Sequence, residues 1–248
     1  MAGHSKFKNI MYRKGAQDAK RARTFTKVGR ELTMAARVGA DPTFNAALRS
    51  AITLAKAVNM SKDRIERAIK RGSSGEDTTQ YEEIAYEGYG PGGVAVIVDA
   101  LTDNRNRTAA EIRAAFNKHG GTLGESGSVA FQFRRVGSIG YPAGAASAEA
   151  MFEAALEAGA EDVESGPGGH EVITLVEDFA AVSEALEARF GRPDSAVVTW
   201  KPLSTVEVDE ERARSLMTLI EALEENDDVR SVSSNLEVSD DVMERLSA

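Results

Sequence analysis

The spacing of apolar residues changes near residue 81, and this change constrains the fold more than any other feature of the sequence. Before it, apolar side chains recur every three or four residues, which is typical of helices packed through one face. After it, short apolar runs are separated by glycine-containing turns and by further helical patterns. We therefore expect a helical N-terminal part followed by parts that mix strands and helices. With 248 residues, the chain is long enough for more than one hydrophobic core.

Three helices are predicted within residues 24–72. Asp41 and Pro42 are a typical helix start, because Asp caps well and Pro at the first helical position lacks only an N–H that has no helical partner. Ser61 is the expected cap of the third helix, and Gly72 is its expected end. No short turn typical of a helix-turn-helix is evident between these helices.

Residues 1–23 contain many charges but few apolar anchors, so we expect a flexible arm that orders on a partner. Residues 73–80, SSGEDTTQ, are expected to form a linker. The arm and the three helices together are assigned to a first domain, residues 1–75.

The remaining sequence predicts two α/β domains, one inserted into the other. Residues 136–202 show the order β-α-β-β-α-β, which is the ferredoxin-like pattern. Residues 81–135 and 203–238 are each incomplete alone, so we expect them to join into one discontinuous α/β sandwich. Separate strands are predicted over 128–136 and 136–141. The expected fold class is α+β, with a basic helical domain, a discontinuous sandwich and an inserted ferredoxin-like domain.

Charge is divided between the same parts of the chain. Residues 1–72 contain 17 Lys and Arg against 5 Asp and Glu, a net charge of +12, whereas the whole chain has a net charge of −9. A basic block in an acidic protein favours a polyanionic partner, and a solvated, highly charged helical face is the alternative.

The arm and the first helix interleave basic and aromatic residues, as do surfaces that bind phosphates and stack on bases. The candidate nucleic-acid-binding residues in this part are His4, Lys6, Phe7, Lys8, Arg13, Lys14, Lys20, Arg21, Arg23, Lys27 and Arg30. Further basic residues, Arg64, Arg67, Lys70 and Arg71, fall on the third helix.

A second candidate segment is TDNRNRT, residues 102–108, which follows a predicted strand and opens a predicted helix. Free N–H groups and the helix dipole at such a position favour anions. Its candidate residues are Asn104, Arg105, Asn106 and Arg107. The segment is equally typical of a helix cap with solvated arginines.

Signals for catalysis are weak. The chain has no cysteine, which excludes disulfides, thiolate zinc sites and cysteine nucleophiles. It has three histidines. His119 and His170 lack spaced partners, and the glycine-rich stretch 88–93 lacks the Lys-Ser/Thr of a phosphate loop. We expect a non-enzymatic protein without a cofactor, metal site or small-molecule substrate. Because no run of about eighteen apolar residues occurs, no membrane span is expected, and a chain without cysteine suits the cytoplasm.

Several of these stretches resemble the YebC/PmpR family. The matching stretches are MAGHSKFKNI, RKGAQDAKRARTFTK, GYGPGGVAVIVDALTDNRNRTAAEIRAAF, GGTLGESGSVAFQF and SNLE. The resemblance implies one helical and two α/β domains. It also implies a DNA-binding transcriptional regulator, or a translational activator that acts at the ribosome and relieves stalling at proline-rich stretches. Phe7 stands where the family usually has Trp, and Ser233 where it usually has an aromatic residue, so Ser233 would weaken any contact made by that aromatic side chain.

The sequence thus predicts a non-enzymatic nucleic-acid-binding regulator of gene expression. Ribosomal RNA or tRNA, and with it the ribosome, is the favoured partner, because a flexible basic arm on an acidic body suits structured RNA. Duplex DNA at promoters is the alternative. A pure protein adaptor would leave the basic block without a purpose.

Overall fold

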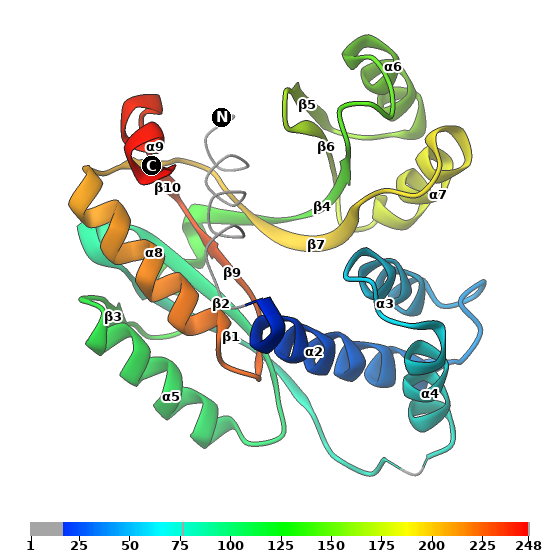
Figure 1. The fold of residues 1–248 in the computed structure, drawn as a ribbon, viewed down its shortest axis with the longest axis horizontal. Coiled ribbons are helices and arrows are strands. Elements are labelled where there is room, and N and C mark those ends of the chain that lie inside the picture. The colour runs from blue at the N-terminus through cyan, green and yellow to red at the C-terminus, as the bar shows by residue number, and fades with distance from the viewer. Residues whose placement is uncertain (1–16, 76, 248) are drawn as a thin grey trace. The chain divides into compact units, whose positions relative to one another are not determined.

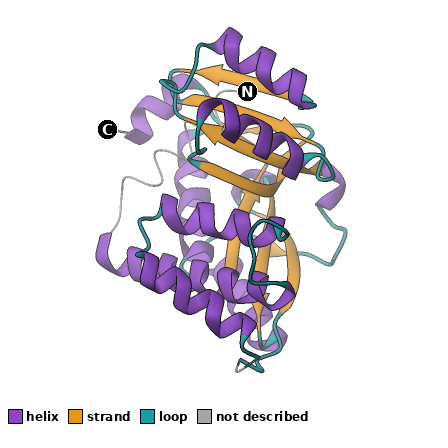
Figure 2. Cartoon of the chain, turned by 90° about the vertical axis from the view of Figure 1, so that its right-hand side faces the viewer, coloured by secondary structure: helices purple, strands orange, loops and turns teal. Residues whose placement is uncertain are grey.

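The computed structural model describes residues 17–75 and 77–247, and the side chains among them except those of 17–21, 240, 243, 244 and 247. Helices occur together with mainly antiparallel sheets, which confirms the α+β class (Figure 2). The chain divides into two compact units. One contains Thr79–Arg134 and the residues from Trp200 onward, and the other contains Arg21–Thr78 and Arg135–Thr199.

The three predicted N-terminal helices are present as α2 (Gln17–Val38), α3 (Ala46–Ala57) and α4 (Lys62–Ser73) (Figure 1). They pack through the predicted apolar stripes, whose buried members include Val28, Leu32, Ala36, Leu48, Ala51, Ala55 and Ile65. Helix α2 already begins at Gln17, so the last seven residues of the expected flexible arm are helical. Residues 1–16 lie outside the described part of the chain.

The start of α3 differs from the sequence prediction. Its cap is Asn45, whose side-chain oxygen accepts a hydrogen bond from the N–H of Leu48 at 3.0 Å. The Asn45 amide also donates to the carbonyl oxygen of Gly39 at 2.7 Å, which ties the cap to the end of α2. Asp41 instead accepts from the N–H of Thr43 and forms a separate turn. Asn45 caps better because it satisfies partners on both helices.

The turn between α3 and α4 is short, contrary to the prediction. Only Val58–Ser61 separate the two helices, and Asn59 adopts a left-handed conformation with φ of 58°. Ser61 occupies the cap position of α4, although its side chain makes no capping hydrogen bond. A connection of this length is within the range of helix-turn-helix motifs, and single-sequence periodicity did not reveal it.

One four-stranded sheet has the order β3-β1-β2-β9. It contains β1 (Glu82–Tyr89), β2 (Ala95–Thr102), β3 (Thr122–Leu123) and β9 (Val229–Ser234), and its registered pairs are antiparallel. The β1–β2 hairpin turns through η1 (Pro91–Gly93), where Gly92 and Gly93 have the positive φ angles of 79° and 76° expected of this turn. Because β9 pairs with β2, segments far apart in sequence build one sheet.

Helices α5 (Arg105–Lys118) and α8 (Glu210–Glu224) lie side by side against one face of this sheet (Figure 1). Val96 and Val98 of β2 pack there with Phe116 and Leu216. The same unit contains the short parallel pair β8 (Val206–Glu207) and β10 (Leu236–Glu237), and the C-terminal α9 (Asp240–Ser247).

The other four-stranded sheet has the order β5-β6-β4-β7, which is the strand order of a ferredoxin-like domain. Its elements follow one another as β4 (Phe133–Tyr141), α6 (Ala148–Ala158), β5 (Asp162–Gly166), β6 (Gly169–Thr174), α7 (Phe179–Phe190) and β7 (Ser195–Pro202). Met151, Val182 and Leu186 of the two helices pack on Ile139 and Val172 of the sheet. The exact boundaries of the three predicted domains stay a prediction.

One strand prediction is wrong. Residues 128–132 are not a strand, because Ala130–Gln132 form η2, and β4 runs from Phe133 without a break to Tyr141. The cause is Glu87, whose carboxylate accepts hydrogen bonds from the N–H groups of Gly127, Val129 and Ala130. These bonds use the backbone donors that a strand would need for its ladder.

Candidate nucleic-acid interface

Most of the predicted arm lies beyond the described residues. His4, Lys6, Phe7, Lys8, Arg13 and Lys14 belong to that part, and the side chains of Lys20 and Arg21 are likewise not described. Their proposed roles stay predictions from the sequence.

The described candidates on α2 share one side of the helix. Arg23, Lys27 and Arg30 are spaced by four and three residues, which places them one above another along α2. All three are half-buried, and each has an interaction within the chain. Helix α2 therefore aligns these cations, although each would have to exchange a contact to bind a phosphate.

Helix α4 presents a more exposed set of cations, namely Lys62, Arg64, Arg67, Lys70 and Arg71. The Arg64 guanidinium lies 5.3 Å from the centre of the Phe25 ring, a cation–π arrangement that fixes this arginine beside α2. Lys62 pairs with Glu66 at 3.6 Å, as exposed helical neighbours do. Lys70 and Arg71 also lie in the last turn, where cations interact favourably with the helix dipole.

Two arginines of the basic helices share one carboxylate. Asp77, whose side chain is 4% exposed, lies 3.3 Å from Arg37 of α2 and 2.9 Å from Arg71 of α4. The Arg37 guanidinium also donates to the Asp77 carbonyl oxygen at 2.8 Å. Sequence reasoning missed this residue because it lies in the polar segment expected to be a linker.

The TDNRNRT segment begins α5 as predicted. Asn104 is the cap, and its side chain accepts a hydrogen bond from the N–H of Arg107 at 3.1 Å. Arg105 and Asn106 are exposed at the first turn, and the Tyr86 hydroxyl donates to the Arg105 carbonyl oxygen. Asn104 and Arg107 are exposed as well, but their side chains make hydrogen bonds that hold the start of α5. Arg105 and Asn106 thus remain the two candidates in this segment whose side chains do not take part in those bonds.

Arg107 has a structural role within the same segment. Its guanidinium donates to Asp228 at 2.6 Å and to Asp103 at 2.9 Å. Asp228 is buried and also accepts from the hydroxyls of Thr102 and Thr108. These hydrogen bonds, chiefly the one with Asp228, raise the pKa of Arg107 above its already high ordinary value. Asp228 lies far along the sequence, so no local signal could have revealed the pair.

Glu87 is a buried carboxylate that the sequence prediction overlooked. It is 6% exposed, and three backbone N–H groups donate to it at 2.7 to 2.8 Å. Burial alone would raise the pKa of Glu87, but the bonds from Gly127, Val129 and Ala130 outweigh burial and hold the pKa below its usual value. The residue organises the GGTLGESGSVAFQF stretch rather than a catalytic site.

His170, one of the histidines without a spaced partner in the sequence, makes contacts within its own domain. His170 is buried, and its Nε2 lies 3.1 Å from the Ala146 carbonyl oxygen while its Nδ1 lies 2.8 Å from the Ser165 hydroxyl. These contacts fix the ring within the inserted sheet.

Within residues 17–75 and 77–247, no cluster of three or more acidic or histidine side chains is placed to hold a metal ion. No helix in the same part of the chain is long and apolar enough to span a bilayer.

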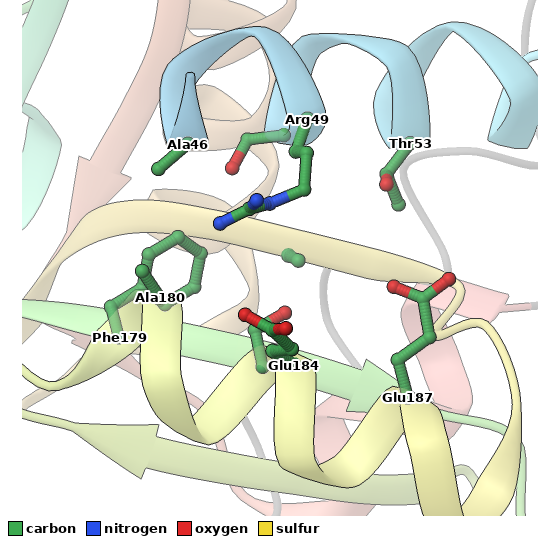
Figure 3. Close-up of a pocket in the computed structure, with 10 residues that line it drawn as sticks. Ala46, Arg49, Thr53, Phe179, Ala180, Glu184 and Glu187 are labelled. Atoms are coloured by element: carbon green, nitrogen blue, oxygen red, sulfur yellow. The ribbon is translucent and has the colours of Figure 1, made fainter. Parts of the chain in front are cut away.

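A small cavity lies between α3 and α7, within a single unit (Figure 3). Its volume is about 170 Å³, below the roughly 300 Å³ at which small-molecule sites begin. Arg49 extends from α3 on one side, and Glu184 and Glu187 rise from α7 on the other (Figure 3). Arg49 already donates to the carbonyl oxygens of Pro42 and Thr43, so its guanidinium is engaged within the chain.

Two sequence families match nearly the whole chain. Residues 5–75 match the family described as TACO1/YebC protein N-terminal domain, and residues 81–236 match the one described as TACO1/YebC second and third domain. The crystal structure of a conserved hypothetical protein from Aquifex aeolicus is similar over 90% of this chain and 93% of that chain. The two share 48% sequence identity, with a TM-score of 0.82.

Proposed function

The chain belongs to the TACO1/YebC family, as the sequence resemblance predicted, and from this premise we propose that its basic helices bind nucleic acid to regulate gene expression. The family implies a nucleic-acid-binding regulator of transcription or translation. In this proposal, the protein acts by binding rather than by catalysis, and it needs no cofactor or metal.

The observation that carries this proposal is the charge of the helical part. Residues 22–75 contain 11 Lys and Arg against 4 Asp and Glu, and α4 presents five of these cations at its exposed surface. The arm adds six more basic residues ahead of them, within residues 1–21. This many cations can neutralise phosphates and release counterions, which provides affinity that does not depend on the sequence of the nucleic acid.

Structured RNA, such as ribosomal RNA or tRNA, is the target we favour. An arm rich in Lys and Arg can follow an irregular backbone, and Phe7 and Tyr12 within it can stack on unpaired bases. The acidic remainder of the chain would be repelled by phosphate and would face protein or solvent. A ribosomal partner implies a cytoplasmic site of action, with relief of stalled translation as the activity.

Duplex DNA is a second candidate, and the turn between α3 and α4 favours it. Two twelve-residue helices joined by four residues, with exposed cations on the second helix, are the elements that a helix-turn-helix uses. In that case α4 would enter the major groove, and the protein would act at promoters as a transcriptional regulator.

Binding across a salt series tests the two targets against each other. The full chain is incubated with purified ribosomes or with promoter-length duplex DNA between about 50 and 200 mM salt, and bound protein is measured by co-sedimentation or anisotropy. We expect ribosome association to persist at the upper end, whereas duplex binding through six to ten phosphates should fall by about 10³- to 10⁵-fold. Sequence-selective duplex binding at 200 mM without ribosome association would instead establish the DNA candidate.

A further inference from the structure

The loop between α2 and α3 exposes an aromatic side chain almost completely. Phe44 is 89% exposed, and Val38 at the end of α2 is 88% exposed. Leaving a phenylalanine in water gives up about 1.5 to 3 kcal/mol of possible burial. A single exposed apolar residue is common on protein surfaces, so the role of Phe44 depends on its surroundings.

Hydrogen bonds on both sides fix the position of this loop. The Arg49 guanidinium donates to the carbonyl oxygens of Pro42 and Thr43 at 3.1 and 2.9 Å, and the Phe44 N–H donates to the Asp41 carbonyl oxygen. The Asn45 amide donates to the carbonyl oxygens of Ala35 in α2 and of Gly39 just after it. Phe44 therefore projects from a rigid turn, with the guanidinium of Arg49 beside the two residues that precede it.

We infer that Phe44 is a stacking platform for an unpaired base of a single-stranded RNA segment. The inference rests on the proposed function and adds a specific contact to it. Residues 22–75 carry seven more positive than negative charges, so a polyanion is drawn to this part of the chain. An aromatic ring exposed on a fixed turn can stack on the face of any base, while cations of the same helical part lie near the phosphates.

Charge separates Phe44 from a second exposed aromatic side chain. Phe152 on α6 is 50% exposed but lies between Glu149 and Glu153, and residues 136–202 contain 12 Asp and Glu against 3 Lys and Arg. Phosphate would be repelled there. Phe152 is thus a matched control, with the same side chain in an anionic setting.

The test measures binding of the full chain to a fluorescein-labelled twelve-nucleotide oligoadenylate RNA by anisotropy, at fixed low salt. We expect Phe44→Ala to weaken binding about 5- to 150-fold, which corresponds to the loss of one stacked base. Phe44→Leu should weaken it similarly, because leucine is apolar but has no ring. Phe44→Trp should retain affinity, and its fluorescence should be quenched by the RNA. Phe152→Ala should bind as the wild type does.

Each other outcome contradicts the inference in a recognisable way. If the wild type binds the RNA and Phe44→Ala binds within twofold of it, the stacking role is wrong while the proposed function stands. If Phe44→Leu retains full affinity, the contact is merely apolar, as for a protein partner. If the wild type binds neither this RNA nor a structured one, the stacking role and the RNA target both fail, and if it does not bind duplex DNA either, the proposed function fails with them. Thermal unfolding of each variant checks the fold, which substitution of so exposed a side chain should not disturb.

Discussion

The carboxylate of Glu87 makes the stability of the folded chain depend on pH, through its hydrogen bonds to the loop that contains Gly127, Val129 and Ala130. Because three backbone N–H groups hold the pKa of this group below its ordinary value of 4.5, its ionised form stabilises the folded state. That stabilisation is fully present above the unfolded pKa and is lost as the pH falls through the lower, folded pKa.

Replacing Glu87 with Gln should therefore destabilise the protein in a pH-dependent manner. At pH 7 we expect the free energy of unfolding to fall by about 1 to 3 kcal/mol, because an amide nitrogen would face N–H groups that need acceptors. As the pH is lowered below the ordinary pKa of 4.5, the wild type should progressively lose this advantage, and the two proteins should converge once the pH has passed through the folded pKa. Urea unfolding at a series of pH values measures the difference. A difference that stays constant from pH 7 to pH 3 would show that the ionised carboxylate is not the stabilising species.

Single residues also account for the part of the candidate site that sequence could not predict. Arg107 and Arg71 match the pattern of phosphate ligands, yet each is paired with a buried carboxylate, Asp228 or Asp77. Neither carboxylate lies in a recognisable motif, and the partner of Arg107 is separated from it by 121 residues. A list of basic residues identifies the charge of a surface, but only the fold shows which cations are already neutralised.

Among the elements, the close approach of α2 and α4 depends on Gly72. This glycine was expected to end α4, but it lies buried within the last turn. A Cβ at Gly72 would overlap the carbonyl oxygen of Thr33 and would lie 3.0 Å from the Ala36 side chain. The glycine is therefore required by helix packing rather than by termination.

Alanine substitutions at two helical glycines should have opposite effects. Gly72→Ala should destabilise the protein by about 1 to 3 kcal/mol, because the added methyl group forces α2 and α4 apart. Gly29→Ala should stabilise it by about 0.5 to 1 kcal/mol, because Gly29 lies inside α2 with no atom within 4 Å of the added methyl group. Urea unfolding of both variants gives the signs. Stabilisation by Gly72→Ala would mean that the two helices are not in close contact.

Among the helices and strands, the sequence predicted those whose positions are determined by the spacing of apolar residues. The three helices within residues 24–72 and the succession of strands and helices in the inserted part follow from apolar spacing and from glycine turns, which are local signals. The errors occur where a distant or bridging group decides the conformation. Asn45 replaced Asp41 as a cap because it reaches α2, and Glu87 prevents residues 128–132 from forming a strand.

The whole molecule separates charge between its parts. Residues 22–75 are basic, whereas residues 136–202 contain four times as many acidic as basic side chains. A polyanion should therefore engage the helical part and avoid the inserted ferredoxin-like part. The charge division could be read directly from the sequence, because net charge does not depend on folding, whereas the choice between RNA and DNA depends on surfaces that the sequence does not define.

The salt dependence of RNA binding by α4 variants tests the central claim most directly. For the full chain on a structured RNA, log K is plotted against log salt concentration for the wild type and for a double variant, Arg67→Gln with Lys70→Gln. The control replaces two cations of the inserted part, Arg189→Gln with Arg192→Gln. We predict that the α4 variant lowers the magnitude of the slope by about 1.4 to 1.8 and that the control leaves it unchanged. An unchanged slope for the α4 variant, with a reduced slope for the control, would contradict the assignment of the basic helices as the nucleic-acid-binding surface.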